Sequence, residues 1–114
     1  MTKSRGGASP YRKGAAFERE WQKRLEEAGW LVVRQPKSQS PFDLLAIWSH
    51  DFREEWKVYL IQCKLAGKLP KKEREELLAY AFKFNISPVL ATKDGLFLWN
   101  GYTEKWTETD YRRI

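Results

Sequence analysis

The spacing of apolar residues changes along this chain from a helical period to strict alternation, and this change limits the folds open to it. Over residues 13–28 apolar side chains recur every three or four residues, which places one apolar stripe on a helix. The stripe consists of Phe17, Trp21, Leu25 and Ala28. Gly29 suits the left-handed position that ends such a helix, whereas residues 57–65 alternate as a β-strand does. The pattern predicts an α/β or α+β domain in which helices cover a mixed sheet.

Turn-forming residues divide the rest of the chain into further elements. The predicted strands are Trp30–Arg34, Asp43–Trp48, Lys57–Leu65, Pro88–Thr92, Leu96–Trp99 and Tyr102–Trp106. A second helix is predicted from Pro70 to Phe84, because proline suits a first turn and an apolar face follows it. The pairs Asp94-Gly95 and Asn100-Gly101 are strong hairpin signals. The tail, residues 108–114, fits neither a helix nor a strand clearly.

The length of the chain predicts one domain with one core. At 114 residues it is too short for a second independent core. Residues 1–10 combine glycine, serine and proline with Lys3 and Arg5, a composition that buries little apolar surface. We therefore expect a flexible basic arm at residues 1–10, followed by a folded domain at residues 11–114.

The charge balance favours a polyanionic partner. Lysine and arginine number 21 against 15 acidic residues, which gives a net charge of +6 and a pI near 9.5. Charge alone fits a DNA-binding protein and a protein kept soluble by its charge equally well. Cys63 is the one cysteine, so an intrachain disulfide is excluded and an intracellular compartment is expected. The chain shows no signal-peptide pattern and no apolar run near the ~20 residues that span a bilayer, so we expect no membrane segment.

Three polar residues stand where predicted strands begin or end. Gln62 and Lys64 lie two residues apart, so they point to one side of their strand and Cys63 points to the other. Asp43 begins the preceding strand. Metal-assisted cleavage of a phosphodiester needs carboxylate oxygens for the ion and a cation near the phosphate, and Asp43 and Lys64 are of these two types. Taken singly, Asp43 is more typical of a turn residue and Lys64 of a solvated strand end.

The order and spacing of several short motifs make the pattern specific. They are Arg12-Lys13-Gly14, Glu18-Arg19-Glu20, Val32-Val33-Arg34, a loop with Ser38 and Ser40, Asp43-Leu44-Leu45-Ala46, Gln62-Cys63-Lys64 and Pro88-Val89-Leu90-Ala91. Over residues 11–93 the sequence resembles the archaeal and phage Holliday junction resolvases of the PD-(D/E)xK nuclease superfamily. The resemblance implies a single-domain α/β fold of the restriction-endonuclease-like type, a mixed sheet flanked by helices. It also implies a homodimer, Mg²⁺ (with Mn²⁺ as a substitute) and paired cutting of four-way DNA junctions in recombination and repair.

The resemblance also assigns roles by position. Glu18, Asp43, Gln62 and the backbone carbonyl of Cys63 would hold the metal, and Lys64 would position the attacking water. Ser38 or Ser40 would take the part of the family's loop serine. The residues expected to contact DNA are Arg12, Lys13, Arg19, Arg34 and Lys37. Without the resemblance, Glu18 is better explained as an exposed helix-surface carboxylate.

One position departs from the family pattern. Gln62 stands where a glutamate is usual, and its amide oxygen brings no negative charge to a Mg²⁺ ion. A working nuclease is the favoured reading. The first alternative is a module that binds branched DNA but cuts it weakly or not at all. The others are a related nuclease acting on nicks, flaps or mismatched duplex, and a basic module with no DNA role.

The two-fold symmetry of a four-way junction favours a dimer, because one chain of this size holds one site. The aromatic residues near the C-terminus are a possible source of an interface. They are Phe97, Trp99, Tyr102 and Trp106, for which packing within the core is the simpler expectation.

Overall fold

The computed structural model describes residues 10–35, 40–50 and 55–112. Within them the elements are α1 (Pro10–Glu27), β1 (Leu31–Arg34), β2 (Leu44–His50), β3 (Glu55–Cys63), α2 (Lys71–Lys83), β4 (Ser87–Thr92), β5 (Gly95–Asn100) and β6 (Lys105–Thr109). The strands form one six-stranded sheet in the order β1-β2-β3-β4-β5-β6. The β3–β4 pair is parallel and the other pairs are antiparallel. The predicted mixed sheet with flanking helices is confirmed.

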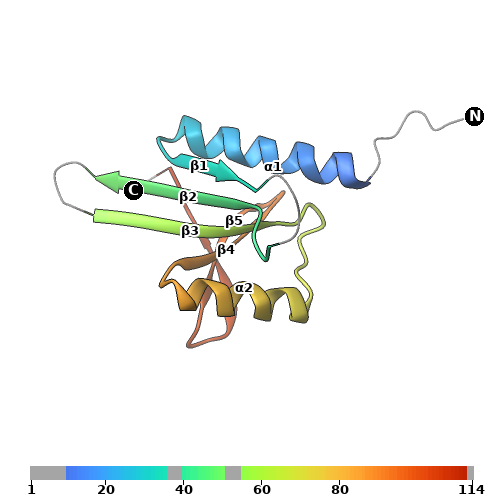
Figure 1. Ribbon diagram of the computed structural model, residues 1–114, viewed down its shortest axis with the longest axis vertical. Helices are drawn as coiled ribbons and strands as arrows, with labels where there is room; N and C mark the ends of the chain where they lie inside the picture. The colour runs from blue at the N-terminus through green and yellow to red at the C-terminus, as the bar shows by residue number, and fades with distance from the viewer. Residues whose placement is uncertain (1–9, 36–39, 51–54, 113–114) are drawn as a thin grey trace, which may run out of the picture.

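Helix α1 covers one face of the sheet through the stripe that the sequence predicts (Figure 1). Trp21 and Leu25 are almost fully buried there, packed in one cluster with strand residues such as Ile61. Gly29 has a φ of 97°, and the backbone N–H of Trp30 donates to the Leu25 carbonyl at 3.0 Å, the closing bond of a Schellman motif. The predicted helix end is confirmed, while the helix begins earlier than predicted, at Pro10.

Helix α2 covers the opposite face and links the parallel strands β3 and β4 (Figure 1). Its Leu77 and Ala81 are fully buried against Leu60 of β3. Since Ile61, the next residue of β3, packs under α1, the alternation predicted for this strand is confirmed. Neither described helix is long and apolar enough to cross a membrane.

The C-terminal hairpin differs from the prediction by its register. Asn100 pairs with Lys105, and the side-chain oxygen of Asn100 accepts hydrogen bonds from the backbone N–H groups of Tyr102 and Thr103. This turn uses residues 101–104, so the predicted strand at Tyr102–Trp106 is wrong by three residues at each end. Asparagine side chains favour such turns over strands.

Backbone hydrogen bonds bring the strand ends of the predicted site to one edge of the sheet. Asp43 lies just before β2, where its N–H donates to the Ile61 carbonyl at 2.7 Å and its carbonyl accepts from Gln35 at 2.8 Å. Lys64 lies just after β3, and its N–H donates to the Ala91 carbonyl at 2.8 Å. Strand β3 runs from Glu55 to Cys63, whereas the predicted strand ran from Lys57 to Leu65.

Candidate active site

Asp43 is a buried carboxylate at the centre of this edge. Its side chain is held by the backbone N–H of Cys63, which donates to Asp43 Oδ2 at 2.8 Å, and the residue is only 6% exposed. Burial raises the pKa of Asp43 above its ordinary value, while the bond from Cys63 and the positive charge of Lys64 act to lower it. The hydrogen bond and the positive charge therefore offset only part of the free energy that the ionised carboxylate loses when it is removed from water.

Glu18 reaches the same region from α1. Its side chain is 16% exposed, and its Oε1 lies 3.7 Å from Nη1 of Arg34. Burial is the largest cause that raises the pKa of Glu18, the negative charge of Asp43 raises it further, and Arg34 opposes both. Two carboxyl groups so placed repel when both are ionised, and a bound cation would relieve that repulsion.

Gln62 presents an oxygen that no protein group satisfies. Among the described residues, Gln62 Oε1 is the buried side-chain oxygen or nitrogen without a hydrogen-bond partner. Such groups are rare in folded proteins, because an unpaired buried oxygen loses its hydration without return. An amide oxygen in this condition is suited to accept a bond from water or to bind a hard cation.

A cavity of about 660 Å³ opens beside these groups. Its lining residues are Ser40, Pro41, Asp43, Gln62, Glu73, Glu76, Ala79, Tyr80 and Lys83. One wall is therefore the edge of the sheet and the other is α2.

Lys64 forms an ion pair that the sequence analysis did not foresee. Its Nζ lies 2.8 Å from Oε1 of Glu73, in the first turn of α2. In the sequence Glu73 is one of several acidic residues near a helix start, where favourable interaction with the helix dipole explains it fully. Its ion pair with Lys64 distinguishes it from Glu75 and from Glu76, although Glu76 also lines the cavity.

The loop serine described by the structure is Ser40. Its Oγ donates to the Phe42 carbonyl at 3.1 Å and accepts from Gln35 Nε2 at 3.1 Å, and the residue also lines the cavity. These bonds hold the loop immediately before Asp43. Ser38 and Lys37, both predicted site residues, lie outside the described residues.

The predicted DNA-contacting residues divide into two groups. Arg12, Lys13 and Arg19 are exposed on α1, and Arg12 and Arg19 share one side of the helix because they are seven residues apart. Arg34, in contrast, is half-buried beside Glu18. The structure thus places a basic helix surface next to the acidic centre.

Cys63 contributes its backbone to the centre, while its side chain packs against the core cluster under α1. Burial strongly raises the pKa of the Cys63 thiol, and the charges of Asp43 and Glu18 raise it further. A thiol of this kind stays protonated and unreactive at neutral pH.

The donor atoms at this edge fit a hard divalent cation. Carboxylate oxygens of Asp43 and Glu18 and the unpaired amide oxygen of Gln62 are of the chemical type that Mg²⁺ prefers. In the described part of the chain, no three His, Cys, Asp or Glu side chains are grouped as a metal site. Gln62 stands where the family pattern has a glutamate, so the site lacks one of the carboxylates that such a group of three would need.

Comparisons with known proteins agree with this geometry. The sequence model of the family described as archaeal Holliday junction resolvase (hjc) matches residues 9–105. Crossover junction endodeoxyribonuclease Hjc of Methanocaldococcus jannaschii is 33% identical over 87 residues, covering 73% of this chain and 60% of that relative. The 1.6 Å resolution structure of Archaeoglobus fulgidus Hjc, a Holliday junction resolvase from an archaeal hyperthermophile, matches with a TM-score of 0.55 and 24% identity, over 75% of this chain and 70% of that one.

The sheet, the two helices of the described residues and the polar cluster at the sheet edge define a restriction-endonuclease-like domain. Within that class, the chain belongs to the archaeal Holliday junction resolvase (hjc) family. It spans 60% of the length of the Methanocaldococcus jannaschii relative.

Proposed function

We propose that this chain is a structure-specific endodeoxyribonuclease that resolves four-way DNA junctions by metal-dependent hydrolysis, acting as a homodimer. One observation carries the proposal: Asp43, Glu18 and the unpaired oxygen of Gln62 lie with Lys64 at one edge of the sheet, beside the exposed basic side chains of α1. The family to which the chain belongs supports the substrate class.

The proposed chemistry follows from the donor set. Asp43, Glu18 and Gln62, together with the backbone carbonyl of Cys63, would hold Mg²⁺ or Mn²⁺. When bound, such an ion supplies Lewis-acid stabilisation of the phosphate and lowers the pKa of a coordinated water. Lys64 would hold the attacking water and balance negative charge that develops on the phosphate.

Binding and cutting are assigned to different residues. Arg12, Lys13 and Arg19 are exposed on α1, where they would contact the phosphate backbone without reading sequence. Arg34 would join them at the edge of the acidic centre, where its positive charge also acts to lower the pKa of Glu18. A dimer with two-fold symmetry would present two such sites to opposed strands of the junction.

Cleavage of a labelled immobile four-way junction tests the proposal. The junction is incubated with and without Mg²⁺, the cut positions are mapped on all four strands, and linear and flap DNA serve as controls. Symmetric, metal-dependent cuts in two opposed strands are expected. Equal cutting of linear or flap DNA would point to another nuclease activity, and tight binding without cutting under any metal would favour a binding module.

A further inference from the structure

Glu73 is a carboxylate of the catalytic region that belongs to no strand and to none of the family motifs named above. It lies in the first turn of α2, its Oε1 is 2.8 Å from Nζ of Lys64, and it lines the same cavity as Asp43 and Gln62. Its negative charge also raises the pKa of Asp43, so its field reaches the buried carboxylate. Glu73 is thus electrostatically part of the site although it is distant from it in sequence.

The charges of the other site residues show why the negative charge of Glu73 matters for binding a cation. When ionised, Glu18 and Asp43 carry two negative charges, which Arg34 and Lys64 balance with two positive ones. Gln62 adds no charge where the family pattern has a carboxylate. Arg19 adds a further positive charge beside Glu18, so without Glu73 these groups would carry no net negative charge and would attract a divalent cation weakly. Glu73 adds one negative charge that acts on Asp43.

We propose that Glu73 supplies from helix α2 the negative charge that Gln62 does not supply from strand β3, and so completes the electrostatics of the cation site. The inference rests on the proposed metal-dependent function. In this arrangement Gln62 Oε1, which has no hydrogen-bond partner among the described residues, remains available as a neutral ligand. Glu73 neutralises Lys64 until DNA arrives, so that the carboxylates retain their attraction for the ion.

A purely structural role for Glu73 makes a different prediction. An acidic residue in the first turn of a helix stabilises the helix dipole, and a half-exposed ion pair adds little to it. In that case replacement of Glu73 would change thermal stability and leave metal affinity unaltered.

The test measures Mn²⁺ binding to the DNA-free protein by electron paramagnetic resonance, for wild type, Glu73→Gln, Gln62→Glu and the double variant. Glu73→Gln should weaken Mn²⁺ binding about tenfold, and Gln62→Glu should strengthen it by a similar factor. The double variant should return to near the wild-type affinity, because the charge has moved from the helix to the strand. This rescue is specific to charge compensation.

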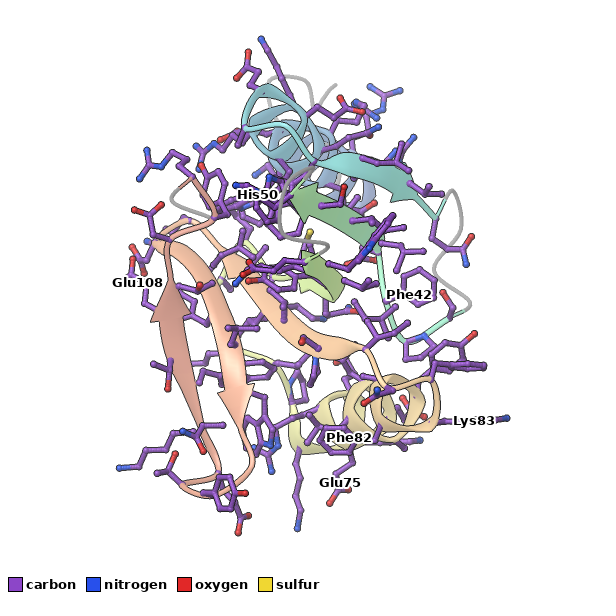
Figure 2. All side chains as sticks on the ribbon, turned by 90° about the vertical axis from the view of Figure 1, so that its left-hand side faces the viewer. Phe42, His50, Glu75, Phe82, Lys83 and Glu108 are labelled. Carbon is purple, nitrogen blue, oxygen red and sulfur yellow. The ribbon has the colours of Figure 1, made fainter. Side chains whose placement is uncertain are left out.

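Glu75→Gln is the matched control. Glu75 lies on the same helix but points away from the sheet (Figure 2), so its loss removes the same charge without touching the site. Its Mn²⁺ affinity should equal that of wild type.

The outcomes separate this inference from the proposed function. If wild type binds Mn²⁺ and cuts junctions but Glu73→Gln binds Mn²⁺ normally, the compensation by Glu73 is wrong and the nuclease assignment stands. A weakened Glu73→Gln that Gln62→Glu does not rescue would also overturn the compensation. If wild type binds no Mn²⁺ and cuts no DNA, both proposals fail.

Discussion

The backbone N–H of Cys63 donates to Oδ2 of Asp43 at 2.8 Å, which fixes the buried carboxylate against the end of β3. Cys63, the last residue of β3, stands between Gln62 and Lys64 in the chain. This hydrogen bond therefore holds the Asp43 carboxylate next to the part of the chain that carries the amide and the ammonium group. The thiol takes no part, because it points to the opposite, core-facing side.

Replacement of Asp43 by asparagine should abolish cleavage and preserve junction binding. The asparagine side-chain oxygen can still accept the bond from Cys63, so the fold is expected to survive, but a charged metal ligand is lost. We expect the cleavage rate to fall at least about 10³-fold, on the scale of losing a principal electrostatic group. Single-turnover cleavage and gel-shift binding check the two parts, and normal cutting by the variant would remove the proposed site.

The same substitution should stabilise the metal-free protein at neutral pH. Burial raises the pKa of Asp43 in the folded state, so folding favours the protonated form. The stability that accompanies protonation is present at low pH and is lost as the pH rises through the raised folded-state pKa. Asp43→Asn, which stays neutral, should therefore unfold at higher denaturant concentration than wild type at about pH 7.

That advantage should shrink as the pH falls from neutral through the raised folded-state pKa of Asp43, because the wild-type carboxyl then becomes protonated. Urea unfolding in EDTA at several pH values measures the difference. Saturating Mn²⁺ should reduce or reverse it at neutral pH, because the ion stabilises the ionised wild-type carboxylate. A difference that is independent of pH would show that the charge of Asp43 is not its cause.

Lys64→Ala should lower the cleavage rate far more than the affinity for the junction. Its ammonium is expected to act on the reacting phosphate or water, and one lysine among many basic groups contributes little to total affinity. We expect a rate loss of about 10²-fold or more and a change in Kd below about threefold. An equal loss of rate and affinity would make Lys64 a binding residue.

Removal of both Lys13 and Arg19 from the exposed surface of α1 should weaken junction binding and flatten its salt dependence. If each contacts one phosphate, the slope of log K against log salt should fall by about 2. Lys105→Ala, an exposed change in β6, is the control and should leave the slope unchanged. A salt titration of binding, carried out without a divalent metal, gives both values. An unchanged slope in the double variant would place the DNA on another surface.

Local patterns account for much of what the sequence predicts correctly. The apolar stripe of α1, the left-handed Gly29 and the alternation of β3 all depend on residues close together in the chain. Alternation alone separates Cys63 from Gln62, because neighbouring side chains of a strand point to opposite faces. The predicted bounds of β6 are wrong, because the side chain of Asn100 accepts hydrogen bonds from two backbone N–H groups and so lengthens the turn. The spacing of apolar residues carries no information about these hydrogen bonds.

The tertiary structure alone decided which polar groups meet. Asp43 and Lys64 come together because β2 and β3 are antiparallel neighbours, so the start of one lies beside the end of the other. Glu73 joins them because the first turn of α2 lies beside Lys64, and nothing in its local sequence distinguishes it from Glu75. Local sequence determines helices, strands and faces through short-range sterics and periodic burial, whereas the electrostatics of the site depends on distances that exist only after the sheet and helices have packed.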